Sequence, residues 1–324
     1  MSQTKKNQTK KYDYTSMGFY TFDCLGRPMT AMPPGADTFF IDEITLAVSG
    51  AAGSAAILAA KHGLNVQAVG GVGADDMGDW VRAKLAHFGV DTQHMMHCDG
   101  FSTSSSMVTI RPNGDRPAFH KLGATAGFFV DDAALNEVID TKIFHIGGVG
   151  LMDRMDQGRT TEVIAAAKAN GCITTLDVFA SKPGDLALIE PLLPHTDYFL
   201  PSIEEAAALS GLQDPQDVAG FLLARGAGAV ILTMGGDGAL YTDQSGTSFH
   251  QPAFDIEIVC SCGCGDCFNA GFATGLFLGK SMADCVTLAQ ASSAQNAMGL
   301  GSQAVVSDLA STLAFIERTA RKSV

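Results

Sequence analysis

Residues 258–271 read IVCSCGCGDCFNAG, a glycine- and cysteine-rich turn between two apolar segments. The apolar pair Ile258 and Val259 predicts the end of a β-strand, and apolar side chains at i, i+4 and i+8 from Phe268 onward predict a helix. The glycines between them then lie at a helix N-terminus, where backbone N–H groups and the helix dipole favour an anion. Asp266 follows in the first turn, so its carboxylate faces the same point. An anion site with a neighbouring base is what phosphoryl transfer to an alcohol requires.

The residues of this stretch leave two other interpretations open. Gly-x-Gly-Asp also occurs as an ordinary strand-to-helix turn, in which Asp266 only caps the helix. The four cysteines at positions 260, 262, 264 and 267 could instead bind zinc or an iron–sulfur cluster. Zinc-binding pairs are usually separated by about two to four residues, often with a second pair far away, and these four are more crowded.

Residues 260–268 resemble the second signature of the PfkB (ribokinase-like) carbohydrate kinases, Asp-Thr-x-Gly-Ala-Gly-Asp-x-Phe. Both glycines, the second aspartate and the phenylalanine match, while Cys260 stands in place of the leading aspartate. The resemblance implies an ATP-dependent kinase that phosphorylates a hydroxyl of a sugar or sugar-like substrate. The implied catalytic residues are Asp266 as the base and, as the anion hole, Gly263, Cys264 and Gly265.

Residues 49–78 resemble the first signature of the same family. Gly73, Asp75 and Gly78 match, whereas serines replace the first glycine of the Gly-Gly pair and the asparagine that follows it. The resemblance implies that the substrate hydroxyls are bound by Asp23, Gly50 and Ser54. Serine lacks the amide that the family's asparagine offers, so the sugar preference is expected to differ.

Two further segments resemble the family's nucleotide-binding elements. Residues 201–206, PSIEEA, are similar to its Asn-x-x-Glu element, and residues 232–239 are similar to its Thr-x-Gly-x-x-Gly segment. The resemblance implies that Glu205 holds Mg²⁺ through water. On the residues alone, the first segment is equally a serine N-cap with glutamates in the first turn. The implied nucleotide-binding residues are Ser202, Thr233, Gly235, Gly238 and Gly301.

From Lys142 onward, apolar strand patterns alternate with helical ones, as in the strands predicted at 143–146 and 230–233. This alternation predicts a parallel sheet with helices on both faces and ligands at the carboxyl ends of its strands. Asp177 directly follows one such strand and equally suits a loop cap. Two long helices are predicted at 282–297 and 309–321.

The first half of the chain adds a buried strand at 16–22 and alternating runs at 37–46 and 103–121, the latter with an Asn-Gly hairpin signal. With the resemblance, we expect an α/β fold, a ribokinase-like doubly wound, mostly parallel sheet with a small β-sheet lid drawn from those two runs. We expect residues 14–324 to form the kinase domain and the Lys- and Thr-rich residues 1–13 to be a disordered tail.

Composition limits the classes of function. Hydrophobic residues make up 46% and charged residues 17% of the 324, which predicts a large core. A net charge of −13 argues against non-specific binding to nucleic acid or anionic membranes. No apolar run approaches the roughly 18 residues of a membrane span. Crowded cysteines without disulfide-like spacing favour reduced thiols, so we expect a cytoplasmic enzyme with a small-molecule substrate.

Other functions within and outside the family stay open. One is a nucleoside kinase of the same fold, and another is a non-catalytic sugar or nucleotide sensor, against which the retained Asp266 argues. The segment after the central strand, Asp177-Val-Phe-Ala-Ser-Lys, lacks the arginine of the Asp-x-Asn-x-Arg element found in relatives that phosphorylate fructose or a sugar acid. An anion could still meet Arg111, His120 or Lys121 on the lid.

Two expectations concern ions and thiols. The leading aspartate of the second signature helps relatives to bind potassium, and a thiol is a poor ligand for a hard cation, so Cys260 predicts weak or absent potassium activation. Cysteines at a helix N-terminus have a lowered pKa, so the thiols near Cys264 are expected to react with thiol reagents, with ATP protecting.

One expectation concerns assembly. The lid strands are rich in Phe, Ile, Met and Val. Because bare sheet edges are relieved by pairing, these strands predict a homodimer joined through the lids.

Overall fold

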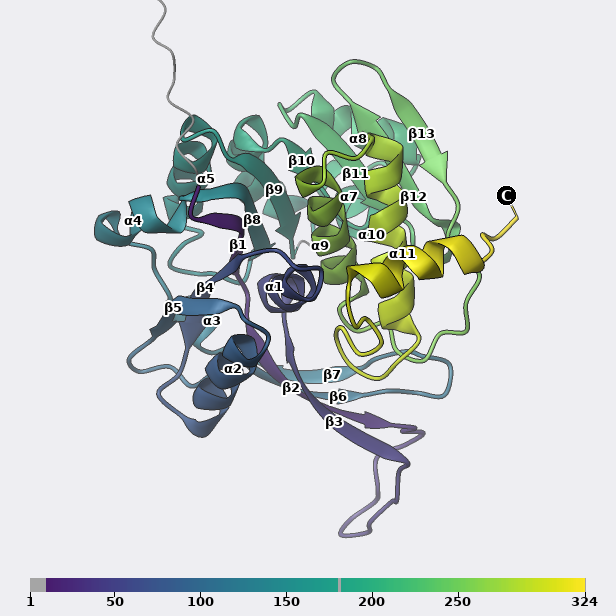
Figure 1. Cartoon of the computed structure of the whole chain (residues 1–324). Helices are drawn as coiled ribbons and strands as arrows, with labels where there is room; N and C mark the ends of the chain where they lie inside the picture. The colour runs from purple at the N-terminus through teal and green to yellow at the C-terminus, as the bar shows by residue number, and fades with distance from the viewer. Residues whose placement is uncertain (1–9, 180–181, 324) are drawn as a thin grey trace, which may run out of the picture.

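The computed structural model describes residues 10–179 and 182–323. Figure 1 shows a body built on one large sheet, with a smaller sheet below it. The strands are β1 (Tyr12–Gly18), β2 (Thr21–Arg27), β3 (Glu43–Ser49), β4 (Val66–Val72), β5 (Asp91–His97), β6 (Ser105–Thr109), β7 (Ala118–Lys121), β8 (Thr141–Val149), β9 (Ile173–Val178), β10 (Tyr198–Phe199), β11 (Ala229–Thr233), β12 (Ala239–Asp243) and β13 (Ser248–Gln251). The α-helices are α1 (Ala51–Lys61), α2 (Asp76–His87), α3 (Ala124–Gly127), α4 (Asp132–Val138), α5 (Arg159–Ala169), α6 (Leu186–Ile189), α7 (Ile203–Ser210), α8 (Pro215–Leu223), α9 (Cys264–Phe277), α10 (Met282–Ala297) and α11 (Leu309–Arg318).

The large sheet has nine strands in the order β13-β12-β11-β10-β9-β8-β1-β4-β5. Every pair from β11 to β5 is parallel, and only β12 and β13 are added antiparallel at one edge. Parallel strands covered on both faces are apolar throughout, and all seven residues of β4 are buried. The doubly wound, mostly parallel α/β sheet is therefore confirmed.

Helices cover both faces of this sheet. On one face α1, α2, α9 and α10 pack against it, and on the other α4, α5, α7 and α8 do so. The core is accordingly split into layers on either side of the strands. The sheet holds β1 between β4 and β8, and the strand order reverses there, which is where ligands bind at the carboxyl ends.

The small sheet has the order β3-β2-β6-β7 and lies against the carboxyl end of the large one (Figure 1). Its β6–β7 turn is the predicted Asn-Gly hairpin, closed by Gly114 N–H donating to the Arg111 carbonyl over 2.9 Å. We call these four strands the lid. The long β2–β3 connection, residues 28–42, extends away from the body.

Several predicted bounds were wrong. The strand predicted at 16–22 is two strands, because β1 ends at Gly18 and the chain crosses to the lid before β2. Gly18 has φ 139°, and a Cβ on it would lie 1.9 Å from the Gly147 carbonyl oxygen, so only glycine permits this exit. The run at 37–46 forms a strand only from Glu43. Asp23 consequently lies inside lid strand β2 and does not follow a core strand.

The predicted tail also ends earlier. β1 begins at Tyr12, so Tyr12 and Asp13 belong to the sheet, while residues 1–9 lie outside the described residues.

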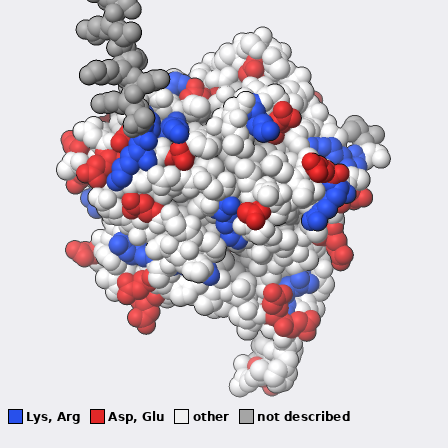
Figure 2. Space-filling model, viewed as in Figure 1, with Lys and Arg blue, Asp and Glu red and all other residues white. Residues whose placement is uncertain are grey.

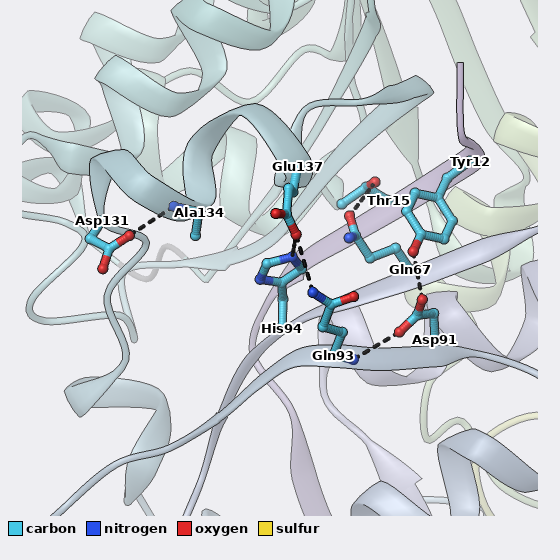
Figure 3. Close-up of polar contacts among 9 residues, drawn as sticks. All are labelled: Tyr12, Thr15, Gln67, Asp91, Gln93, His94, Asp131, Ala134 and Glu137. Atoms are coloured by element: carbon cyan, nitrogen blue, oxygen red, sulfur yellow. Dashed lines mark hydrogen bonds and ion pairs between the residues drawn. The ribbon is translucent and has the colours of Figure 1, made fainter. Parts of the chain in front are cut away.

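The amino edge of the large sheet is held by polar contacts (Figure 3). The Tyr12 hydroxyl donates to Asp91 and the Thr15 hydroxyl to Gln67, which joins β1 to its neighbours. His94 and Gln93 both contact the Glu137 carboxylate of α4, at 3.2 and 3.1 Å. These contacts fix strand starts against a helix and leave the opposite edge for ligands.

On the face drawn in Figure 2, acidic and basic side chains are interspersed. Within the described ranges, no helix combines the length and apolar character that crossing a membrane would need.

Candidate active site

The turn before α9 has the geometry that the sequence predicted. Gly263 is the N-cap, with φ 70° and no side-chain cap, and Cys264 begins the helix. A Cβ on Gly263 would lie 2.6 Å from Ser302 Oγ, while nothing lies within 4 Å of one on Gly265. No side chain caps this first turn, whose Cys264 N–H makes only a long 3.4 Å bond to the Ser261 carbonyl, and the turn is open beside Gly265, as an anion site requires.

The segment before this turn is not the predicted strand. Ile258 and Val259 lie in irregular chain, and the N–H groups of Val259 and Cys260 donate to the Ala297 carbonyl at the end of α10, over 2.8 and 3.1 Å. The C-terminus of α10 thus replaces a sheet partner in holding the segment. The lid hairpin reaches the same place, since a Cβ on Gly114 would lie 3.2 Å from Ile258 Cγ2.

A cavity of about 210 Å³ opens beside the first turn of α9. Cys264 and Gly265 line it at one end, apolar side chains such as Phe254 and Ile256 line a wall, and Lys322 adds a cation. Three of the five residues predicted to bind nucleotide line it, and they are Thr233, Gly235 and Gly238.

The two other predicted nucleotide residues lie elsewhere. Ser202 caps α7 and is not part of the cavity wall. Gly301 packs toward the lid, where a Cβ would lie 3.4 Å from Thr45 Cγ2. The cavity therefore gives neither residue a contact with a nucleotide.

Three carboxylates gather at the carboxyl edge of the sheet: Asp177 near the end of β9, Glu205 in α7 and Asp266 in α9. Burial raises the pKa of Asp177 well above its ordinary value, and the charges of Glu205 and Asp266 raise it further. Burial raises the pKa of Glu205 as well, and the charge of Asp266 adds to it. The three groups are thus close enough to repel one another.

Glu205 is also part of a capping box, the alternative that the sequence left open. Its carboxylate accepts from the Ser202 N–H at 3.0 Å and hydroxyl at 2.8 Å, and the Ser202 hydroxyl accepts from the Glu205 N–H at 3.2 Å. The cap fixes the side chain without excluding a ligand role.

Asp266 lies between this cluster and the lid. Burial raises its pKa, while the Ser54 hydroxyl and the Arg116 guanidinium offset part of the rise and the charge of Asp23 adds to it. Ser54 Oγ is buried and makes no hydrogen bond within normal limits to a described residue. Asp266 therefore faces α1 and the lid as well as the anion site.

The predicted substrate residues come together on the lid side of Asp266. Gly50 is the N-cap of α1 with φ 86°, and a Cβ on it would lie 2.5 Å from the Phe19 carbonyl oxygen. Asp23 accepts a hydrogen bond from Thr21 Oγ1 at 3.3 Å. Burial raises the pKa of Asp23, although hydroxyls of Ser106 and Ser49 lower it. Asp266 thus lies between the first turn of α9, which borders the cavity, and the polar side chains of Asp23 and Ser54.

Comparison with known proteins identifies the family of the chain. The family model described as pfkB family carbohydrate kinase matches residues 38–308. The chain belongs to the pfkB family of carbohydrate kinases. The resemblance seen in the sequence and the kinase class that it implied are therefore confirmed.

Individual relatives are distant. The chain is 25% identical over 293 residues to an ATP-dependent 6-phosphofructokinase of Thermoanaerobacterium thermosaccharolyticum, covering 88% of each chain. It is 27% identical to the aminoimidazole riboside kinase of Salmonella typhimurium, covering 77% of this chain and 80% of the relative. The fold matches that of Arabidopsis thaliana ribokinase complexed with ribose and ATP, with a TM-score of 0.80, 20% identity and coverage of 94% and 99%.

The cysteines of the pfkB turn are free thiols, and their chemistry differs from the expectation. Among the described residues, no three His, Cys, Asp or Glu side chains are placed to hold a metal ion. A hydrogen bond from Cys262 lowers the pKa of Cys260 to about 6, whereas burial raises that of Cys264 to about 11. Burial at the helix start outweighs the dipole, so the thiolate is Cys260 and not a cysteine of α9.

Sequence reasoning missed some residues of this pfkB site. Asn269 lies one turn after Asp266 and near Asp177, and neither its side-chain nitrogen nor its oxygen has a hydrogen-bond partner among the described residues. The spacing i, i+3 from Asp266 could have identified it. Lys322 lies far along the chain from every motif, and no sequence signal marks it.

Proposed function

We propose that this protein transfers the γ-phosphoryl group of ATP to a hydroxyl of a sugar or sugar-like alcohol. The observation that carries the proposal is the position of Asp266, in the first turn of a helix with an open N-terminus, between a cavity of about 210 Å³ and the polar side chains of Asp23 and Ser54. The cavity beside the helix N-terminus suits the phosphate end of a nucleotide, and the polar side chains suit a small polyol. Relatives that phosphorylate sugars and ribosides agree with this division.

In this proposal Asp266 is the general base. Its carboxylate accepts the proton of the attacking hydroxyl, and the raised pKa that burial gives it makes it a better proton acceptor than an exposed aspartate. The backbone N–H groups of Gly263, Cys264 and Gly265 stabilise the negative charge on the transferred group. Asp23, Gly50 and Ser54 hold the other substrate hydroxyls.

Mg²⁺ fits the carboxylate cluster. The mutual repulsion of Asp177, Glu205 and Asp266 is what a divalent cation would relieve, and Mg²⁺ supplies charge neutralisation to ATP phosphates. Since no three metal-ligating side chains of the described chain gather around one point, Glu205 and Asp177 would hold it through water. Such waters would also meet the unpartnered amide of Asn269.

The lid supports the proposed homodimer. Its outer face exposes Ile44 by 67%, Met107 by 63% and Phe119 by 60%, an apolar surface of the kind that a second copy would cover. Light scattering at micromolar protein should give twice the 33.8 kDa chain mass, and a monomer would contradict the proposal.

An ADP-release screen tests the function. The purified chain is incubated with ATP, Mg²⁺ and a panel of sugars, polyols, nucleosides, sugar acids and sugar phosphates. Nucleosides are the second substrate class to include, because Phe19 places an aromatic ring beside Gly50 where a base could stack. Stimulated ADP release with at least one alcohol supports the proposal, and release with none overturns it.

A further inference from the structure

Three neighbouring lid strands carry one polar row. The strand register pairs Asp23 of β2 with Ser106 of β6, and Ser106 with His120 of β7. Directly paired residues point to the same face of a sheet. Ala47 of β3, the other partner of Asp23, is only 8% exposed, so this face is turned toward the body.

The next row along the same strands confirms the orientation. It consists of Leu46, Cys24, Met107 and Phe119, and its large side chains are 44%, 63% and 60% exposed at Leu46, Met107 and Phe119. On β2, β3 and β6 the polar row is therefore the less exposed one and faces the body, whereas His120 lies on the edge strand β7, all of whose residues are exposed.

His120 is held in this row by two contacts. Its Nδ1 lies 2.9 Å from Ser106 Oγ, and its ring meets the Phe19 ring edge-on, with centroids 5.4 Å apart and planes at 88°. Its Nε2 makes no hydrogen bond to any described residue. Phe19 is also the residue whose carbonyl contacts Gly50, so His120 packs against a residue that contacts the predicted substrate site.

The proton positions follow from the order of the row. An ionised carboxylate can only accept hydrogen bonds. The single hydroxyl proton of Ser106 is therefore donated to Asp23, and this hydrogen bond lowers the pKa of Asp23. His120 then donates from Nδ1 to Ser106 Oγ, which leaves Nε2 as an acceptor. Burial lowers the pKa of His120, although the charge of Asp23 opposes this, so the neutral imidazole is favoured near neutral pH.

We infer that His120 is a specificity-determining residue of the sugar site, where its Nε2 accepts a hydrogen bond from a second substrate hydroxyl beside the one that Asp23 holds. The inference rests on the proposed kinase function. Asp23 and His120 both accept, so the lid selects hydroxyl donors. A carboxylate or phosphate group at this position would face two acceptors and be disfavoured. At this position the substrate therefore presents an uncharged hydroxyl group.

The test compares His120→Ala, His120→Gln and the matched control Lys121→Ala, the next residue on the same strand, which lies on the opposite face. With the best substrate from the screen, His120→Ala should raise the sugar KM roughly threefold to tenfold, the worth of one hydrogen bond, with the ATP KM unchanged. Glutamine offers an acceptor oxygen and should restore part of the affinity. Lys121→Ala should resemble the wild type.

Deoxy analogues of the substrate separate contact from mere positioning. One monodeoxy analogue should have the same KM with the wild type and with His120→Ala, because the missing hydroxyl is the one that His120 binds. A wild-type enzyme that prefers a sugar acid or a sugar phosphate, or a KM unchanged in His120→Ala, would overturn the inference while leaving the kinase function intact. Absence of turnover with every alcohol would overturn the kinase function, and this inference with it.

Discussion

The pKa values of carboxyl groups are shifted in opposite directions at the two edges of the large sheet. At the amino edge, partial burial works to raise the pKa of Asp91, but hydrogen bonds from Tyr12 and Gln93 outweigh it and the net pKa is lowered (Figure 3). At the carboxyl edge, burial and mutual repulsion raise the pKa values of Asp177 and Glu205. The first arrangement stabilises the folded chain. The second costs stability, and perturbed carboxylates that persist in a cleft are typical of a functional site.

The largest expected effect belongs to the carboxyl edge. Asp266→Asn removes the proposed base but keeps the size of the side chain, so kcat should fall by about 10²–10⁴-fold. Asp91→Asn, at the other edge, should leave kcat unchanged. Steady-state ADP release on the substrate found by the screen measures both. A loss of less than about tenfold in Asp266→Asn would exclude general-base catalysis by this residue.

The second effect concerns the thiol that the same edge activates. Cys260 has a pKa of about 6 and is wholly buried under the lid, so an alkylating reagent should inactivate the enzyme through Cys260 when the lid opens. The thiolate is lost on protonation, and the inactivation rate should therefore fall as the pH is lowered through about 6. Bound substrate should slow the inactivation.

Variants identify the reacting cysteine. Cys260→Ser should resist the reagent, whereas Cys285→Ser, altered at a buried thiol in α10, should behave as the wild type. Resistance in Cys264→Ala instead would show that the helix start activates its own thiol, contrary to the burial argument.

The third effect tests the sign of the stability difference between the edges. A carboxyl group whose pKa is raised by folding costs stability that is full above the folded value and disappears as the pH falls to the unfolded value, 3.8 here. Asp177→Asn should therefore raise Tm by a few degrees at neutral pH and give little difference in acid. Differential scanning calorimetry measures this, and a lowered Tm at neutral pH would mean that Asp177 is a net structural contact.

The fourth effect has the opposite sign and lies at the amino edge. Tyr12→Phe removes the hydroxyl that donates to Asp91 and should lower the free energy of unfolding by about 1 kcal/mol at neutral pH. A lowered carboxyl pKa stabilises the chain above the unfolded value, 3.8 here, and this contribution is lost as the pH falls through the folded value. The variant and the wild type should thus converge below about pH 3.8. A difference that persists below that pH would place the effect in packing and not in Asp91.

The sequence predicted what local pattern controls. α10 spans Met282–Ala297 as predicted, and the helix start at Gly263 followed from glycine chemistry and apolar spacing. It did not predict the exit of β1 into the lid. That exit depends on how closely Gly18 packs against Gly147 of the neighbouring strand, where an added Cβ would lie 1.9 Å from the Gly147 carbonyl oxygen. The sequence also did not predict the order of the cysteine pKa values, because burial by the lid and by α10 decides which thiol ionises.

The smallest expected effect is the response to potassium. Cys260 occupies the position where the second pfkB signature has an aspartate, so the carboxyl edge lacks one oxygen ligand that relatives offer a monovalent cation. Its sulfur is wholly buried and already accepts from the Cys262 N–H at 3.4 Å, and sulfur binds hard cations poorly. Titrating potassium against a tetramethylammonium control should give no measurable activation, whereas Cys260→Asp should introduce one. Strong activation of the wild type would show that backbone carbonyls of the turn are sufficient ligands. In that case this edge would bind cations through its backbone as well as through the carboxylates that distinguish it from the amino edge.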